Sequence, residues 1–285
     1  DDKKELPPCI VRKHDGAALY ATSDLATLIE REKDYHPGHV IYVVDKRQEL
    51  HFTQVFRVAK MTGIVGEDTP LTFIGFGTMN GTDGKPFKTR DGGVMRLEML
   101  ISDVSEKVYE KILENRDISE EEAREISKII GLAAIKYGDL SNQATKDYVF
   151  DIDRFTSFEG NTGPYILYTI VRIKSILKKY AEQGNELSAN GKIVDFGSES
   201  ERSLKLVLTQ FNDVMEASYN ELAPHRVCAY IYEVANAFNR FYHENNIMNE
   251  ENADKQKSYI NLLTLTKKVL EQCIDLLAID APERM

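Results

Sequence analysis

Three cations lie within six residues in the segment Gly84-Lys85-Pro86-Phe87-Lys88-Thr89-Arg90. Pro86 fixes one φ angle and the neighbouring glycines permit positive φ, so the segment is predicted to form a turn. Lysine supplies a compact positive charge and arginine a fork of donors, and both stabilise charge on phosphoryl oxygens. The chemistry that suits this loop is therefore the handling of a polyphosphate. The spacing alone leaves a solvated hairpin tip as an equally good interpretation.

The chain before this loop alternates between strand-like and helix-like patterns. Residues 40–45 are an apolar run ending at Asp45, as expected for a parallel strand buried on both faces. A helix is predicted from about 49 to 61, and a second strand over 71–76. This order predicts a parallel sheet, whose ligands bind beyond the carboxyl ends of the strands. Residues 45–48 and 75–90 occupy those ends.

Tyr20 and Asp24 lie four residues apart, where an extended segment over 18–22 is predicted to meet a helix. Their side chains can point into the same cleft. A carboxylate there can bind a guanidinium through paired, charge-assisted hydrogen bonds, with Tyr and Gln side chains as neutral partners. The plainer alternative is that Ser23 or Asp24 caps the helix, and the residues alone favour it.

The rest of the chain is predicted to be mostly helical. A helix over 97–112 precedes a second one that begins at Ser119, where Ser119 and Glu122 have capping-box spacing. The less periodic segment 138–163 is predicted to be a linker packed between domains. Further helices are predicted over 164–180, 199–219, 224–242 and 254–277. Together they indicate an antiparallel bundle of four or more helices.

The helix over 164–180 has two faces of different chemistry. Its apolar stripe consists of Ile166, Ile170, Ile173 and Leu177. Its other stripe consists of Tyr165, Tyr168, Arg172, Ser175 and Lys179. Exposed tyrosines next to cations suit unstacked RNA bases, which stack on aromatic faces while cations meet phosphates. The alternative is that these tyrosines pack against a neighbouring helix, which is the commoner case.

Composition excludes several classes of protein. A chain of 285 residues with 42% hydrophobic residues can bury a full core and is predicted to form two domains. Its net charge of −10 argues against indiscriminate nucleic-acid binding, so an RNA contact must be local. The sequence has no apolar run of membrane-spanning length. Three scattered cysteines form no metal-ligand spacing and suggest reduced thiols in the cytosol.

The string from Met79 to Arg90, with Lys85 and Lys88 in a K-x-x-K-T pattern, resembles the second class I signature of the arginyl-tRNA synthetases. Segments 19–26 and 45–54 are similar to the arginine-pocket segments of that family. Residues 163–168 resemble the family's G-P-Y-L-Q-Y, with Leu167 where Gln is usual, and 223–226 and 281–285 are similar to further landmarks. These matches cover nearly the whole chain.

The resemblance implies a role for particular residues and a set of ligands. Lys85 and Lys88 would be the catalytic lysines, and ATP would be bound by Lys85, Lys88, Gly77 and Met79. Arginine would be held by Tyr20, Asp24 and Gln48, whereas His51 and Gln54 receive no role. The tRNA would contact Tyr165, Tyr168, Arg172, Tyr242 and Met285. The implied ligands are arginine, tRNA(Arg) and ATP with Mg²⁺, without a structural metal, DNA or a membrane, in the cytoplasm.

The resemblance also implies an α/β domain followed by an all-α domain. Residues 1–112 would be the second half of a Rossmann-type catalytic domain, 113–162 a connecting helical segment and 163–285 the anticodon-binding bundle. The string His36-Pro37-Gly38-His39 echoes the first class I signature but is interpreted as a turn, because it follows the arginine-pocket helix. The first signature is then absent. We expect an inactive carboxyl-terminal fragment of an arginine–tRNA ligase.

Two rival interpretations remain open at this point. One is a binding module that holds tRNA through the bundle and performs no chemistry. The other is an unrelated nucleotide-binding protein whose 84–90 loop only mimics the signature. Stabilisation of the protein against heat by arginine would distinguish a member of the family from the second rival, because a generic nucleotide-binding protein has no site for arginine.

Overall fold

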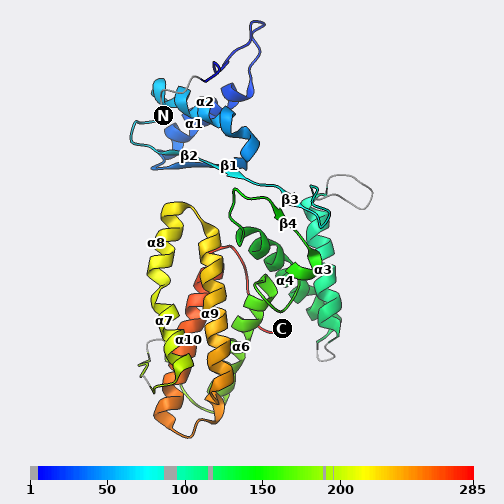
Figure 1. Cartoon of the computed structure of the whole chain (residues 1–285), viewed down its shortest axis with the longest axis vertical. Coiled ribbons are helices and arrows are strands. Elements are labelled where there is room, and N and C mark those ends of the chain that lie inside the picture. Colours follow the sequence, from blue (N-terminus) through cyan, green and yellow to red (C-terminus); the bar gives the residue numbers. More distant parts are fainter. Residues whose placement is uncertain (1–5, 87–94, 115–117, 189–190, 195) are drawn as a thin grey trace. The chain divides into compact units, whose positions relative to one another are not determined.

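The computed structural model describes residues 6–86, 95–114, 118–188, 191–194 and 196–285. The chain divides into two compact units. The first consists of residues 1–78 and 144–148, and the second of 79–143 and 149–285 (Figure 1). The functional division predicted after residues 112 and 162 stays a prediction.

The first unit is a parallel βαβ unit with one additional helix. It contains α1 (Tyr20–Tyr35), β1 (Val40–Asp45), the short 3₁₀ helix η1 (Lys46–Gln48), α2 (Glu49–Met61) and β2 (Leu71–Phe76). The strands pair in parallel, from Val40 with Leu71 to Asp45 with Phe76, which confirms the predicted parallel sheet. The Phe52 ring of α2 lies 4.7 Å from the Tyr42 ring and 5.9 Å from the Phe73 ring. This aromatic cluster fixes α2 against one face of the sheet.

The prediction that the first strand is buried on both faces is wrong. Ile41 and Val43 are 41% and 61% exposed. Side chains alternate between the two faces of a strand, and α2 packs on the face that carries Tyr42. Ile41 and Val43 point to the other face, so the apolar run does not report burial on both sides.

The predicted start of the first helix is also wrong. Residues 20–22 are helical, not extended, and the helix begins at Tyr20 after an extended Leu19. The Leu19 N–H donates to Thr22 Oγ1 over 3.0 Å, so Thr22 satisfies the backbone at the helix start. Asp24 therefore lies inside the helix, and the N-cap interpretation of Asp24 is excluded.

The second unit begins with a hairpin and continues with helices. Its elements are β3 (Met79–Asn80), α3 (Leu97–Leu113), α4 (Glu120–Leu140), α5 (Ile152–Phe155), α6 (Gly163–Glu182), α7 (Glu199–Thr209), α8 (Phe211–Glu221), α9 (Pro224–Glu244), η2 (Ile247–Asn249) and α10 (Ala253–Leu276). The short strand β4 (Tyr148–Val149), at the boundary of the two units, pairs with β3. Ser119 Oγ accepts from the Glu122 N–H over 3.3 Å, which confirms the predicted cap of α4.

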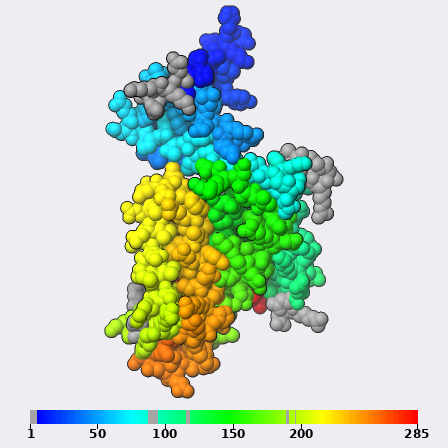
Figure 2. All heavy atoms as spheres, in the orientation of Figure 1, coloured from blue at the N-terminus to red at the C-terminus, as the bar shows by residue number. Residues whose placement is uncertain are grey.

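Helices α6–α10 form the predicted bundle, in which α9 returns antiparallel to α7 and α8 (Figure 1). The apolar stripe of α6 is confirmed, since Ile166, Ile170 and Ile173 are at most 1% exposed. Figure 2 shows the later helices of this unit, in yellow and orange, packed along the residues in green. The segment 138–163 predicted as a linker contains the end of α4, β4 and α5.

One predicted helix is two helices. The pattern over 199–219 predicted a single helix, but α7 ends at Thr209 and α8 begins at Phe211, with Gln210 between them. The Gln210 N–H donates to the Val207 carbonyl, three residues back, so a tighter turn interrupts the α-helical ladder. Gln210 keeps a right-handed helical conformation, and no Gly or Pro marks this position in the sequence.

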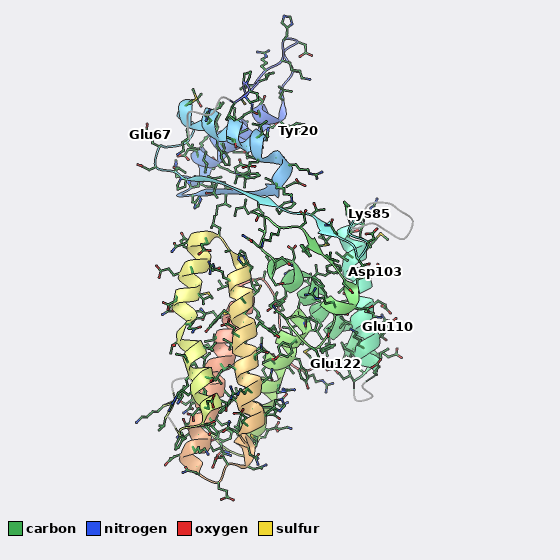
Figure 3. All side chains as sticks on the ribbon, viewed as in Figure 1. Tyr20, Glu67, Lys85, Asp103, Glu110 and Glu122 are labelled. Carbon is green, nitrogen blue, oxygen red and sulfur yellow. The ribbon has the colours of Figure 1, made fainter. Side chains whose placement is uncertain are left out.

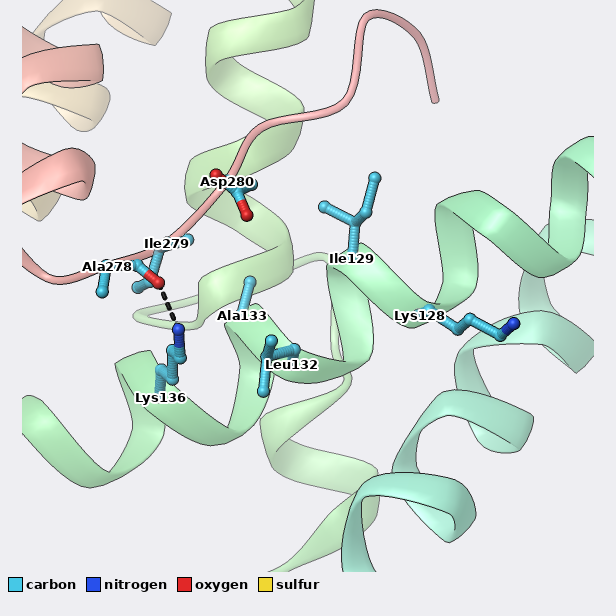
Figure 4. Close-up of a pocket in the computed structure, with 8 residues that line it drawn as sticks. All are labelled: Lys128, Ile129, Leu132, Ala133, Lys136, Ala278, Ile279 and Asp280. Carbon is cyan, nitrogen blue, oxygen red and sulfur yellow. Dashed lines mark hydrogen bonds between the residues drawn. The ribbon is translucent and has the colours of Figure 1, made fainter. Parts of the chain in front are cut away.

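The carboxyl-terminal residues after α10 run across α4 and α6. Lys136 donates to the carbonyl oxygen of Ala278 beside a groove of about 170 Å³ (Figure 4). Lys174 pairs with Glu283 at 2.7 Å, and Arg284 pairs with Glu122 of α4. The hydrogen bonds from Arg284 and Lys174 lower the pKa of Glu122 and of Glu283, respectively.

These ion pairs predict that acid releases the carboxyl-terminal segment. Because the folded-state pKa of both carboxyls is lowered, their stabilisation is complete at neutral pH and is lost as the pH falls through those lowered values, below the usual glutamate pKa of about 4.3. The NMR signal of the Met285 methyl group should shift toward its unfolded position in that range. Arg284→Ala should produce part of the same shift at pH 7; an unchanged signal in that variant would contradict the docking by this pair.

Candidate functional site

The side chains predicted to bind arginine lie in the first unit. Tyr20 and Asp24 are one turn apart on α1, and Gln48 ends η1. Tyr20 is 86% exposed, on the surface of the unit (Figure 3), and Gln48 is also exposed. Buried Ala21, Leu25 and Leu28 fix the orientation of α1. No interaction of the described residues joins Gln48 to Tyr20 or Asp24, so their joint use on one ligand stays a prediction.

Asp24 instead contacts His51, which the sequence left without a role. His51 Nε2 lies 2.6 Å from Asp24 Oδ2, and their side chains are 29% and 28% exposed. The His51 ring also meets the Phe52 ring edge-on at 5.0 Å. The pair uses Oδ2 alone, and no hydrogen bond of the described part of the chain engages Oδ1. The sequence analysis placed Asp24 at the helix start and did not predict this contact with α2.

The carboxyl ends of β1 and β2 carry a second group of charges. Asp45 accepts from both the backbone N–H and the guanidinium of Arg47, and these hydrogen bonds lower the pKa of Asp45 to about 2. Lys46 pairs with Asp147 at 2.7 Å, and Asp147 also accepts from the Thr78 N–H. This pair ties residues 144–148 to the end of the sheet.

Gly77 lies in close contact with residues 144–148. A Cβ at Gly77 would lie 2.4 Å from the carbonyl of Lys146, and the Gly77 N–H donates to the Ala144 carbonyl. Packing therefore requires glycine here, whatever the ligand. The predicted contact of Gly77 with ATP stays a prediction.

A hairpin turn over residues 81–85 leads into the cationic loop, of which the structure describes Gly84, Lys85 and Pro86. The Gly81 N–H donates to the Lys85 carbonyl, the Lys85 N–H donates to Asp83 Oδ1, and Gly84 has a φ of +73°. Lys85 is exposed (Figure 3). Lys88, Thr89 and Arg90 lie outside the described residues, and half-buried Met79 begins the hairpin in β3. Lys85 thus lies exposed at the end of the turn, opposite Gly81.

Four of the five side chains predicted to meet RNA come together on α6 and α9. The guanidinium carbon of Arg172 lies 4.7 Å from the Tyr168 ring centroid and 5.3 Å from that of Tyr242. Tyr168 is 40% exposed, and the half-buried Tyr242 ring stacks on Phe238 at 6.0 Å. A cation held over two aromatic rings is a surface suited to nucleobases and phosphates.

Tyr165 is not the freely exposed tyrosine that the sequence predicted. Its hydroxyl donates to Asn236 Oδ1 over 2.7 Å and accepts from Asn239 Nδ2 over 2.9 Å. Its ring meets the Tyr232 ring at 5.8 Å, and burial raises its pKa. Tyr165 therefore packs largely against the neighbouring helix α9, which was the alternative interpretation. Tyr168 keeps the larger free surface.

Met285 packs, partly buried, against the core of the second unit beside Arg284. The interactions of the described residues do not link it to the Tyr168, Arg172 and Tyr242 cluster. Its predicted contact with RNA therefore stays a prediction.

The two buried cysteines of the described residues have a structural role. Burial raises the pKa of Cys228 and of Cys273 to about 12, so both thiols stay protonated. Within the described ranges, no group of three His, Cys, Asp or Glu side chains could hold a metal ion. Among the described helices, none combines the length and apolarity needed to cross a membrane.

Two family models match the chain in succession. Residues 3–152 match the class I tRNA synthetase (R) catalytic domain, and residues 166–285 match the DALR anticodon binding domain. These matches place the chain among the class I aminoacyl-tRNA synthetases, with an anticodon-binding domain after the catalytic domain. Within that class, the chain belongs to the arginyl-tRNA synthetase family.

Similar proteins agree with this assignment over the whole chain. Arginine–tRNA ligases of Agathobacter rectalis and Alkaliphilus oremlandii are 59% and 61% identical across 100% of the chain. The chain spans only 49% and 48% of them, about half their length. An arginyl-tRNA synthetase structure from Plasmodium falciparum has a TM-score of 0.77 at 26% identity, covering 96% of this chain and 46% of that one. The Thermus thermophilus structure, at 21% identity, shares the fold with a TM-score of 0.79, covering 97% and 51%.

The contact between Asp24 and His51 predicts a measurable coupling. In a double-mutant cycle of Asp24→Asn and His51→Gln, the free energies of urea unfolding should be non-additive by roughly 0.5 to 1 kcal/mol, because the pair is only partly shielded from water. The same cycle of Asp34→Asn with His51→Gln is the control, since Asp34 is exposed near the far end of α1. Additive effects of Asp24→Asn and His51→Gln would show that the pair does not form.

Proposed function

We propose that this chain supplies the arginine pocket, the signature loop and the anticodon-binding bundle of a cytoplasmic arginine–tRNA ligase. The observation that carries the proposal is the succession of a catalytic and an anticodon-binding domain in one chain, related over its full length to arginine–tRNA ligases. Because the chain spans about half of those relatives, the activity itself is part of the proposal.

The proposed reaction has two steps. The carboxylate of arginine attacks the α-phosphate of ATP, which is supplied with Mg²⁺, to give arginyl-adenylate and pyrophosphate. The arginyl group then passes to the terminal ribose of tRNA(Arg), and AMP leaves. Lys85, at the end of the hairpin turn, and Lys88 supply positive charge to the phosphates as negative charge develops there. Gly77 and Met79 complete the proposed ATP contacts.

The proposed arginine pocket uses Asp24 as the partner of the substrate guanidinium. The Asp24 carboxylate is partly buried and holds His51 through one oxygen, which leaves the other for a guanidinium N–H. A guanidinium can donate only, so a carboxylate is its natural partner, while Tyr20 and Gln48 add neutral contacts.

The proposed tRNA contacts are Tyr165, Tyr168, Arg172, Tyr242 and Met285. Support comes from the match to an anticodon-binding domain and from the guanidinium of Arg172, which lies over the Tyr168 and Tyr242 rings. Bases of an anticodon loop are unstacked, so they can stack on such rings, and Arg172 can meet a phosphate or a base acceptor.

Removal of the Asp24 carboxylate should weaken arginine binding in a full-length arginine–tRNA ligase that contains this sequence. Loss of one partner of a charge pair costs about 2 kcal/mol or more, so Asp24→Ala should raise the KM for arginine by roughly 30-fold or more. The KM for ATP should change far less. Asp34→Ala, on the exposed end of the same helix, is the matched control, and an unchanged arginine KM in Asp24→Ala would remove Asp24 from the pocket.

A binding assay and an exchange assay separate the ligase from a non-catalytic tRNA-binding module. We expect the 285-residue chain to bind tRNA(Arg) weakly in a gel shift and to show no ATP–pyrophosphate exchange by itself, whereas a full-length protein containing it should show exchange. A full-length protein that binds tRNA(Arg) but never forms adenylate would favour the module.

The ring of Tyr168 should contribute directly to tRNA binding. A stacked base is worth about 1 to 3 kcal/mol, so Tyr168→Ala should raise the Kd for tRNA(Arg) roughly tenfold. Tyr219→Ala is the matched control, because Tyr219 is 77% exposed on α8 of the same unit. Equal weakening by the two substitutions would assign the loss to general surface effects.

A further inference from the structure

Asn239, in the second half of α9, forms hydrogen bonds to three side chains of α6 through its side-chain amide. Its Oδ1 accepts from Arg172 Nη1 over 2.7 Å. Its Nδ2 donates to the Tyr165 hydroxyl over 2.9 Å and to Thr169 Oγ1 over 3.3 Å. The sequence analysis gave Asn239 no role.

The chemistry of its partners allows only one orientation of this amide. A guanidinium has donors and no acceptor, so the atom that faces Arg172 must be the oxygen of Asn239. The nitrogen then faces Tyr165 and Thr169, whose own protons are already placed. Tyr165 donates its proton to Asn236 Oδ1, and Thr169 donates its proton to the Tyr165 carbonyl over 3.0 Å. The hydroxyl protons of Tyr165 and Thr169 therefore each have an acceptor, and both hydroxyl oxygens can accept from Asn239.

This network orders the Arg172 side chain, which has the most rotamer freedom on this surface. An arginine side chain loses up to about 2 kcal/mol of rotamer entropy when it is ordered. Asn239 holds Arg172 where its guanidinium covers the rings of Tyr168 and Tyr242. A partner that meets an already ordered guanidinium does not have to order it on binding.

The same network limits what Tyr165 can do. Its hydroxyl has one proton, which goes to Asn236, and it also accepts from Asn239. The hydroxyl is thus engaged within the protein. Tyr165 can offer ring surface but has no proton left for a base edge.

We propose that Asn239 is a positioning residue for RNA recognition by this chain. It sets the Arg172 guanidinium over the two tyrosine rings before RNA arrives and makes no RNA contact itself. The free N–H groups of Arg172 then meet a phosphate or base acceptor of the RNA. This inference rests on the proposed binding of tRNA through the face formed by α6 and α9.

The test is a double-mutant cycle on the Kd of the 285-residue chain for tRNA(Arg), measured by fluorescence anisotropy. Arg172→Ala and Asn239→Ala should each weaken binding about tenfold, as expected when a hydrogen bond to a charged group is lost. In the Arg172→Ala background, Asn239→Ala should cause little further loss, because it acts through Arg172.

A second measurement separates positioning from a general effect on folding. In the RNA-free protein, the Nε–H NMR signal of Arg172 should be that of an ordered guanidinium, and Asn239→Ala should convert it to that of a mobile one. Asn239→Asp keeps an acceptor for Arg172 and should keep the ordered signal. Asn220→Ala, at an exposed asparagine of α8, is the control and should alter neither the signal nor the Kd.

The outcomes distinguish this inference from the function on which it rests. If the wild-type chain does not bind tRNA(Arg), or if Arg172→Ala leaves the Kd unchanged, binding through this face is refuted and the inference with it. If Arg172→Ala weakens binding but Asn239→Ala does not, or if the two effects add, the inference alone is overturned. An Arg172 signal that stays ordered in Asn239→Ala would also overturn it.

Discussion

The burial of α6 on nearly every side is the constraint on which the second unit depends. Its first residue, Gly163, lies so close to α4 that a Cβ would come within 2.5 Å of the Ala133 carbonyl. Ile166, Ile170 and Ile173 are buried in the core that α6 shares with α4, α9 and α10. A helix held this closely can expose only a narrow strip. That strip carries Tyr168 and Arg172, so the packing that stabilises the bundle also positions the surface proposed to bind RNA.

The first unit couples packing to chemistry in the same way. The aromatic cluster of Tyr42, Phe52 and Phe73 holds α2 against the sheet, and α2 presents His51 to Asp24 on α1. The carboxylate proposed to bind arginine is thus oriented by a neighbouring helix, not left free on the surface. A carboxylate with a fixed orientation can select a planar guanidinium more sharply than a mobile one can.

The negative net charge requires any recognition of RNA by this chain to be local. With a net charge of −10, the protein as a whole repels a polyanion, and unspecific contacts contribute little. A single arginine held over two rings offers directional hydrogen bonds and stacking surface at one place instead. Such a surface can favour an RNA loop with unstacked bases over a regular duplex, whose bases are already stacked.

The sequence by itself determined the parallel βαβ order, the capped start of α4, the turn at Lys85, the helical bundle and the apolar stripe of α6. These features follow from local rules: hydrophobic periodicity, capping spacing and the φ preferences of Gly and Pro. The sequence predicted three features wrongly: the start of α1, the burial of β1 and the continuity of the helix over 199–219. A hydrogen bond to Thr22 decides the start of α1, and one to Val207 decides the break at Gln210. The exposure of β1 depends on which face of the sheet is covered. The partners of Asp24 and Arg172 lie 27 and 67 residues away along the chain. No sequence pattern links such distant residues, so only the packing of α1 on α2 and of α6 on α9 decided that His51 and Asn239 hold these two charges.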